Sequence, residues 1–276
     1  MIRVGISGTE CSHAGEFVAS LAGQSRVQLV ACLPGEGEPI PGVEVAGDIA
    51  DLVDGVDAVA IFDRDPRRHA ELALPALAAG RPTFVDKPMT SDLGQARELV
   101  DAAARAGVGL TSFSALRYLP QVDRWHQLVE QARGHAGVAA VSAVGPADPE
   151  GPHAGAWFYG VHVPEMLRGL VEGLVEVTVE ADRGRVRASG LTPDGVEVSM
   201  TLVDDNDHPF TLGAVDARGN SQLTTLEVGA DYYAGAAQEL IGFLAGDTPS
   251  VSVESMFASL DATERMVNAW REAGRG

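Results

Sequence analysis

The sequence is poor in cysteine and in basic residues, and it has no long apolar run. Cys11 and Cys32 are the only cysteines and belong to no spaced metal motif, so we expect free thiols and no metal site. Lys and Arg total 20 against 39 Asp and Glu, and the net charge of −19 disfavours nucleic acid and anionic membranes as partners. No apolar stretch approaches the ~18 to 20 residues that span a bilayer, and the N-terminus reads as a strand rather than a signal peptide. These absences indicate a cytoplasmic protein.

Hydrophobic side chains make up 45% of the 276 residues, enough for a packed core in one large domain or two modest ones. In residues 1–116, short apolar runs alternate with amphipathic stretches of helical spacing. Expected strands are 2–7, 27–33, 58–62, 82–85 and 108–113, and expected helices are 14–23, 48–53, 66–79 and 92–106. The last helix begins at a cap, Ser91 or Asp92, and stops at Gly107. This alternation predicts an α/β domain with parallel βαβ units in a doubly wound sheet.

The rhythm changes in residues 117–276. We expect a helix at 117–132, a strand at 138–145, a helix from 163, strands at 174–181, 185–189, 196–203, 209–215 and 221–227, and helices at 232–245 and 254–273. The last helix is capped by Ser252 or Glu254 and ends at Gly274. These elements predict an α+β domain with an open, mainly antiparallel sheet arranged as a meander. The C-terminal helices can pack back on the first domain.

The loop after the first strand, GISGTECSHAGEF, only partly matches a dinucleotide-binding loop. Gly8 fills the place of the first glycine, but Glu10 and His13 stand where the second and third would fall. A carboxylate near a pyrophosphate is unfavourable unless it points away. The second strand ends in Leu33-Pro34, with Glu36 as the nearest acid for a ribose and with no arginine for NADP. A glycine in this turn can also serve the turn alone, so the loop leaves dinucleotide binding open.

The stretch PTFVDKPMT places a charged pair at the end of a buried strand. Ligands of doubly wound sheets bind at the carboxyl ends of the strands, where Lys87 follows Asp86. Pro88 fixes the direction of the chain beyond the lysine. An ordinary loop lysine would need no such position, so the location favours a functional role.

The stretch AWFYGVHVPEML brings His162 to the approach of a helix in the second domain. A histidine there is often a cap or a packing residue, but its titration near neutrality also suits proton transfer. Tyr159 and Glu165 lie three residues to either side and can share its face. The three form a polar cluster in an otherwise apolar segment.

Four stretches, RVGISGTECSH, DAVAIFDRDPRRHAELALPALAAGRPTFVDKPMT, SALRYLP and YGVHVPEML, together resemble the Gfo/Idh/MocA oxidoreductase family over residues 1–170. The stretch ELIGFLAGDTPSVSVESMFASLDATERMVNAW is similar to the closing helices of that family. The resemblance implies a Rossmann domain that binds NAD or NADP, and a second domain whose sheet forms a homodimer or homotetramer. The implied reaction passes hydride between nicotinamide and a hydroxyl or carbonyl carbon of a small-molecule substrate: a sugar, cyclitol or similar compound.

The resemblance also implies roles for individual residues. Lys87 would lie beside the nicotinamide and polarise the reacting oxygen, and His162 would exchange the proton, with Tyr159 as a further catalytic candidate. The cofactor-binding candidates are Gly8, Thr9, Glu10, His13, Asp63, His69, Asp86, Lys87 and Pro88. The substrate-binding candidates are Arg117, Tyr118 and Glu165.

The chain departs from this family at one catalytic position as well as in the loop. The family often has Asp four residues before the histidine, where this chain has Phe158, and Tyr159 or Glu165 could substitute. A non-catalytic ligand-binding or regulatory protein on the same fold is therefore the second hypothesis. The acidic stretch VDDNDH, residues 203–208, is more typical of a hairpin turn than of a metal site.

Overall fold

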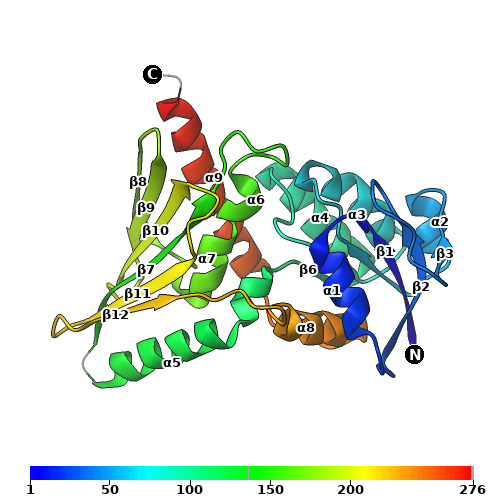
Figure 1. Cartoon of the computed structure of the whole chain (residues 1–276), viewed down its shortest axis with the longest axis horizontal. Coiled ribbons are helices and arrows are strands. Elements are labelled where there is room, and N and C mark those ends of the chain that lie inside the picture. Colours follow the sequence, from blue (N-terminus) through cyan, green and yellow to red (C-terminus); the bar gives the residue numbers. More distant parts are fainter. Residues whose placement is uncertain (136, 275–276) are drawn as a thin grey trace. The chain divides into compact units, whose positions relative to one another are not determined.

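The computed structural model describes residues 1–135 and 137–274, which form two compact units (Figure 1). The first unit consists of Met1–Phe113 together with Tyr233–Met256. The second consists of Ser114–Tyr232 together with the chain from Phe257 onward. Each unit is therefore built from two separate stretches of the sequence.

A parallel sheet forms the centre of the first unit, with the strand order β3-β2-β1-β4-β5-β6. Its strands are β1 (Ile2–Ser7), β2 (Val27–Leu33), β3 (Glu44–Val45), β4 (Ala58–Ile61), β5 (Thr83–Val85) and β6 (Leu110–Thr111). The strand order reverses between β1 and β4, which is the switch point where doubly wound sheets bind ligands. The predicted doubly wound sheet is confirmed, and only the short β3 was not predicted.

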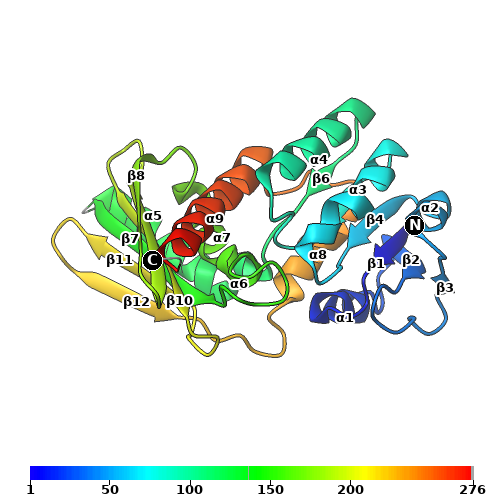
Figure 2. The same ribbon diagram turned by 90° about the horizontal axis from the view of Figure 1, so that it is seen from above.

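Helices cover both faces of this sheet (Figure 2). They are α1 (Ser12–Ser20), α2 (Ile49–Asp54), α3 (His69–Ala78) after the 3₁₀ turn η1 (Pro66–Arg68), α4 (Leu93–Ala106) and α8 (Ala234–Leu244). α2 contacts α3 and α3 contacts α4, whereas α1 contacts α8. All four residues of β4 are buried, as expected for a strand covered on both faces.

The ends of α4 follow local signals in the sequence. The Asp92 side chain accepts a hydrogen bond from Gln95 N at 2.8 Å, so Asp92 rather than Ser91 is the N-cap. Gly107 ends the helix at φ 67°, in the left-handed region that glycine enters without steric cost. The predicted cap and stop are confirmed.

The second unit is built on a mixed sheet with the strand order β12-β11-β7-β10-β9-β8. Its strands are β7 (Val138–Ala147), β8 (Val175–Ala181), β9 (Arg185–Leu191), β10 (Glu197–Asp204), β11 (Thr211–Asp216) and β12 (Ser221–Thr225). The expected meander is wrong in one respect, because β7 inserts between β10 and β11 and pairs in parallel with β10. Valine and alanine make β7 apolar enough for this inner position, which local turn signals cannot reveal. The other pairings are antiparallel, as predicted.

The helical elements of this unit are η2 (Ala115–Tyr118), α5 (Pro120–His135), α6 (Trp157–Gly160), α7 (His162–Leu167), η3 (Arg168–Leu170) and α9 (Val253–Ala273), whose first turn belongs to the first unit. α5 begins later than expected, because Pro120 suits the first helical position and keeps Leu119 extended. The helix expected from residue 163 is preceded by α6. Among residues 1–135 and 137–274, no helix is long and apolar enough to cross a membrane.

The acidic stretch at residues 203–208 forms a turn after β10. Asp205 O accepts from His208 N at 3.0 Å, and the Asp205 carboxylate accepts from Asp207 N at 3.0 Å. The stretch is therefore a turn, as predicted, but it is not a hairpin, because β7 lies between the two strands that it joins, β10 and β11. Cys11 and Cys32 are both free thiols, as predicted.

His126 on α5 makes stability depend on pH. Burial lowers the pKa of His126 to about 4 from an ordinary value of 6.5, although its bond to Met166 O opposes the shift. Between these two values the unfolded chain binds a proton at His126 that the folded protein does not bind. The free energy of unfolding is therefore unaffected by His126 above pH 6.5 and falls as the pH drops from 6.5 toward about 4. The expected loss is about 3 kcal/mol. Urea unfolding across this range should show it, and His126→Gln should flatten that part of the profile.

Candidate functional site

Three consecutive residues after β5, Asp86, Lys87 and Pro88, are buried, with Lys87 only 6% exposed. Of the 20 lysine and arginine residues in the chain, Lys87 is the single lysine. An ammonium is compact and can release its proton, whereas a guanidinium stays charged. The one position that carries lysine is thus a buried one at the ligand-binding end of the sheet.

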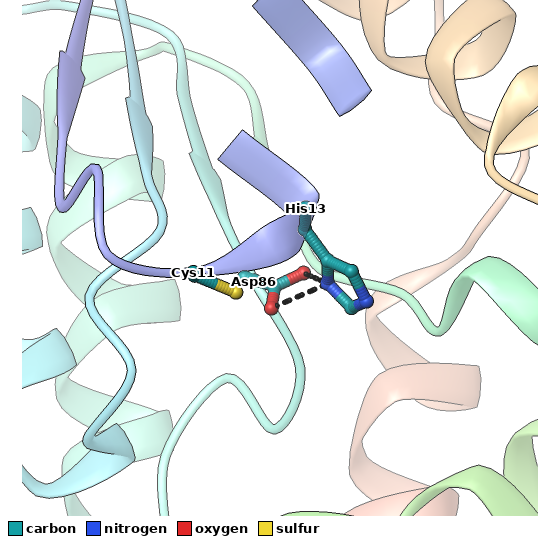
Figure 3. Close-up of side chains that lie close together, drawn as sticks. All are labelled: Cys11, His13 and Asp86. Atoms are coloured by element: carbon teal, nitrogen blue, oxygen red, sulfur yellow. Dashed lines mark hydrogen bonds and ion pairs between the residues drawn. The ribbon is translucent and has the colours of Figure 1, made fainter. Parts of the chain in front are cut away.

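The Asp86 carboxylate is paired with His13 from the first turn of α1 (Figure 3). His13 Nδ1 lies 3.0 and 2.9 Å from its two oxygens. Burial alone would raise the pKa of Asp86, but the charge and hydrogen bond of His13, followed by the charge of Lys87, outweigh it and hold this pKa below its usual range. His13 also stacks on Tyr233, with ring centroids 5.1 Å apart. The sequence-predicted residues His13, Asp86 and Lys87 are therefore brought together.

His69 and Asp63 connect the ends of β4 and β5. The His69 ring contacts three backbone oxygens: Pro88 O at 2.9 Å and Met89 O at 3.3 Å through Nδ1, and Asp63 O at 2.7 Å through Nε2. The Asp63 carboxylate accepts from Ser7 Oγ at 2.7 Å and pairs with Arg68 at 2.8 Å. Burial raises the pKa of Asp63, and these two partners oppose the rise. Both residues thus hold the turn that carries Lys87.

The phosphate loop is tightly folded at its glycine. Gly8 has φ 79°, and a Cβ added there would lie 2.3 Å from Asp63 N, so only glycine fits. The Glu10 carboxylate accepts from Arg64 N at 2.9 Å through Oε1. Glu10 Oε2 is buried without a hydrogen-bond partner. This carboxylate is therefore anchored on the β4 side of the loop, with one acceptor atom left over.

The segment after β2 packs against the same loop. Thr9 Oγ1 donates to Glu38 O at 2.8 Å, and a Cβ added at Gly37 would lie 2.3 Å from Thr9 Oγ1. A side chain at position 37 would therefore separate the two segments. Between Val27 and Asp63 the chain has no lysine or arginine. The segment from Val27 to Asp63 is therefore acidic, and Arg68, a basic side chain that interacts with Glu10 of this loop, is paired with Asp63.

In the second unit, His162 is the first residue of α7 and is 6% exposed. Its Nδ1 lies 2.6 Å from Ser114 Oγ, which also accepts from Leu116 N at 3.1 Å. The ring packs edge-on against Phe210, with centroids 5.4 Å apart. Ser114 is thus an oriented partner for the position that the sequence singled out.

The remaining sequence candidates lie around the same turn. The carboxylate of Glu165 pairs with Arg117 at 3.2 Å, and both side chains are buried. Burial raises the pKa of Glu165, while Arg117 and a bond from the Ser114 N–H lower it. Tyr118 is half-buried, and Tyr159 is 37% exposed with its ring 6.3 Å from that of His162. Residues of the 3₁₀ turn η2 therefore hold the polar side chains of α7.

Sequence reasoning missed Ser114 as a partner of His162. The stretch SALRYLP contains it, and a serine two residues before a turn amide is a common cap. The contact with His162 joins residues 48 positions apart, so no local pattern announces it. Phe158, where the resemblance implies an aspartate, packs on His153 and Tyr159.

Residues 2–113 match the family described as "Oxidoreductase family, NAD-binding Rossmann fold", Gfo/Idh/MocA. This part of the chain is therefore similar to the NAD-binding domain of that family. An inositol 2-dehydrogenase of Klebsiella pneumoniae (strain 342) is 38% identical over 82 residues, which are 28% of this chain and 24% of that relative. The matched region thus spans about a quarter of the relative's length.

Solved structures share the fold along the whole chain. Myo-inositol 2-dehydrogenase from Lactobacillus plantarum has a TM-score of 0.80 at 15% identity, covering 100% of this chain and 98% of that one. GenD2 from gentamicin A biosynthesis, in complex with NAD, has a TM-score of 0.79 at 18% identity, covering 99% and 94%. At these identities the likeness concerns the fold, which has a Rossmann unit and a second, mainly antiparallel unit.

The residues of the first unit fit a dinucleotide, NAD or NADP. Cys11, the N-cap of α1, makes no side-chain cap bond, so the helix N-terminus can receive a phosphate on its backbone amides. The unpartnered Glu10 Oε2 can accept a bond from a ribose hydroxyl, which the residues ending β2 cannot do. Glu10 would thus supply the acid that a Rossmann fold usually has after its second strand.

Proposed function

We propose that this protein is an NAD-dependent oxidoreductase of a cyclitol, sugar or similar polyol, in which Lys87 and His162 handle the proton. The observation that carries the proposal is the single lysine of the chain, buried after β5 beside the Asp86–His13 pair. The match of residues 2–113 to an NAD-binding oxidoreductase family supports the reaction class. The inositol 2-dehydrogenases among the relatives support the substrate class.

When bound, the nicotinamide supplies the position that accepts or donates hydride. The Lys87 ammonium hydrogen-bonds the substrate oxygen and stabilises the negative charge that develops on it during transfer. His162 takes the hydroxyl proton in oxidation and returns it in reduction. Asp86, held ionised mainly by His13, places a negative charge beside Lys87.

Ser114 orients His162 in this scheme. An Oγ atom has two lone pairs, so it can accept from Leu116 N and from His162 Nδ1–H together. That arrangement assigns proton exchange to Nε2 and supports the ring when it becomes charged. The resemblance implies an aspartate beside the histidine, at the position where this chain has Phe158. The neutral Ser114 would take over the role of that aspartate.

The surroundings of the phosphate loop favour NAD over NADP. The orphan Glu10 Oε2 suits a hydroxyl and repels a 2′-phosphate. The segment from Val27 to Asp63 has no basic residue to offset that repulsion, and Arg68, which interacts with Glu10, is already paired with Asp63 and Glu71. We expect NADH to bind at least about tenfold more tightly than NADPH, a difference of ~1.4 kcal/mol. Titration of nicotinamide fluorescence measures both constants. Glu10→Gln should narrow the gap, whereas the exposed Glu36→Gln should leave it unchanged, and a preference for NADPH would contradict the assignment.

The second hypothesis, a non-catalytic protein on the same fold, leads to a different prediction. The chain then remains folded but shows no nicotinamide-linked turnover on a panel of inositols, hexoses and sugar acids. Reductive methylation modifies amines and further distinguishes the two hypotheses, because Lys87 and the N-terminus are the only amines in this sequence. Protection of Lys87 by NADH, read by mass spectrometry, would place the cofactor beside it even without a substrate.

We further propose that the chain forms a homodimer or homotetramer through the sheet of the second unit. Residues that alternate with its buried ones, such as Ser142, Val144 and Thr201, are small and only half-buried. Together with charged side chains of β8 and β9 they line a hollow that a second copy can cover. Sedimentation velocity measures this association, and a monomer at micromolar concentration would contradict it.

A further inference from the structure

A thiol, an imidazole and a carboxylate converge beside Lys87 (Figure 3). Cys11 precedes α1, His13 lies in its first turn, and Asp86 follows β5. One ligand atom from each side chain lies within 4.8 Å of the other two. In Figure 3 the Cys11 sulfur and the His13 ring both point toward the Asp86 carboxylate. Within residues 1–135 and 137–274, no other such group of three occurs.

We propose that Cys11, His13 and Asp86 bind a thiophilic divalent cation of the zinc class. Thiolate, imidazole and carboxylate are the three ligand types that zinc takes from proteins. With bonds of about 2.0 to 2.3 Å, tetrahedral ligands stand roughly 3 to 4 Å apart, so side-chain adjustments of about 1 Å close this cluster around an ion. Three protein ligands leave a fourth position for water.

The charges of the cluster suit a divalent ion. The Asp86 carboxylate and a Cys11 thiolate together offset two positive charges, while the Lys87 ammonium opposes binding. Burial first, and then the charge of Asp86, raises the pKa of Cys11 to about 11, so at neutral pH the thiol keeps its proton. A cation must displace that proton as its bond to sulfur forms. The sulfur favours zinc or cobalt over magnesium and calcium.

Cobalt(II) is the probe for this site. A chelator-treated sample of the whole chain, titrated with Co²⁺, should develop one equivalent of thiolate-to-cobalt charge-transfer absorption in the near ultraviolet. Zn²⁺ should then remove the band. Cys11→Ser should abolish it, whereas Cys32→Ala, which changes a fully buried thiol on β2, should keep it.

His13→Gln and Asp86→Asn test the other two ligands. Each should weaken Co²⁺ binding by more than about 100-fold, beyond the ~10- to 100-fold typical of lost outer-shell partners. Melting temperatures establish that each variant is folded, and only folded variants are compared. No band in the unmodified chain, a band that survives Cys11→Ser, or binding unaffected by both His13→Gln and Asp86→Asn overturns the site. The absorbance does not depend on hydride transfer, so this outcome is separate from that of the proposed function.

Discussion

Lys87→Ala should lower kcat by about 10²- to 10⁴-fold, the range that a positioned acid–base or charge-stabilising group contributes. Lys87 is the single lysine of the chain, so no other lysine side chain can replace its ammonium group. The effect should fall on kcat more than on KM, because the interaction strengthens as charge develops on the substrate oxygen. The measurement is steady-state nicotinamide absorbance with the best substrate of the polyol panel.

Two further variants separate charge from chemistry at this position. Lys87→Arg keeps the positive charge but replaces the compact, buried ammonium with a larger, planar group that cannot occupy the same place, so it should not restore turnover. Arg97→Ala removes an exposed cation from α4 and should leave kcat unchanged. NADH affinity and melting temperature show whether Lys87→Ala keeps its fold and its cofactor. An unaltered kcat in Lys87→Ala would exclude Lys87 from the reaction.

The first unit could be predicted closely, because its signals are local. Strands of unbroken apolar residues, the cap at Asp92 and the stop at Gly107 each depend on neighbours in sequence. The order of the second sheet could not be predicted in the same way. β7 pairs with β10 across more than fifty residues, and hairpin turns carry no information about a strand that inserts from upstream. Such long-range pairing depends on which apolar faces fill the centre of the sheet.

In the candidate site, too, local features could be predicted and long-range contacts could not. Lys87 and His162 could be selected from sequence because each sits at the end or start of an element with a known geometric role. Ser114 and the pairing of the candidates His13 and Asp86 could not be predicted, since Asp86 meets His13 and Ser114 meets His162 only after folding. Glu10 is the instructive case. From the sequence, a carboxylate at this position was expected to disfavour phosphate binding. In the structure, the carboxylate accepts a hydrogen bond from Arg64 N, which fixes its place in the loop.

His162→Ala should lower kcat by about 10²- to 10⁴-fold, since it removes the group that exchanges the proton. Ser114→Ala tests whether the hydroxyl positions that ring. It should lower kcat by about tenfold or more and move the acidic limb of the kcat profile to lower pH, because the charged ring loses its acceptor. Loss of the cap on Leu116 N should also cost ~1 kcal/mol of stability.

Ser114→Thr distinguishes positioning from packing, because it keeps an Oγ atom at the same place and should restore both kcat and the pH profile. Ser259→Ala, a buried serine on α9, is the matched control and should change neither. A purely structural role for Ser114 predicts that Ser114→Ala lowers the melting temperature while the pH profile stays where it was. In that case His162 would act without this hydroxyl, and Ser114 would serve only as the cap of η2.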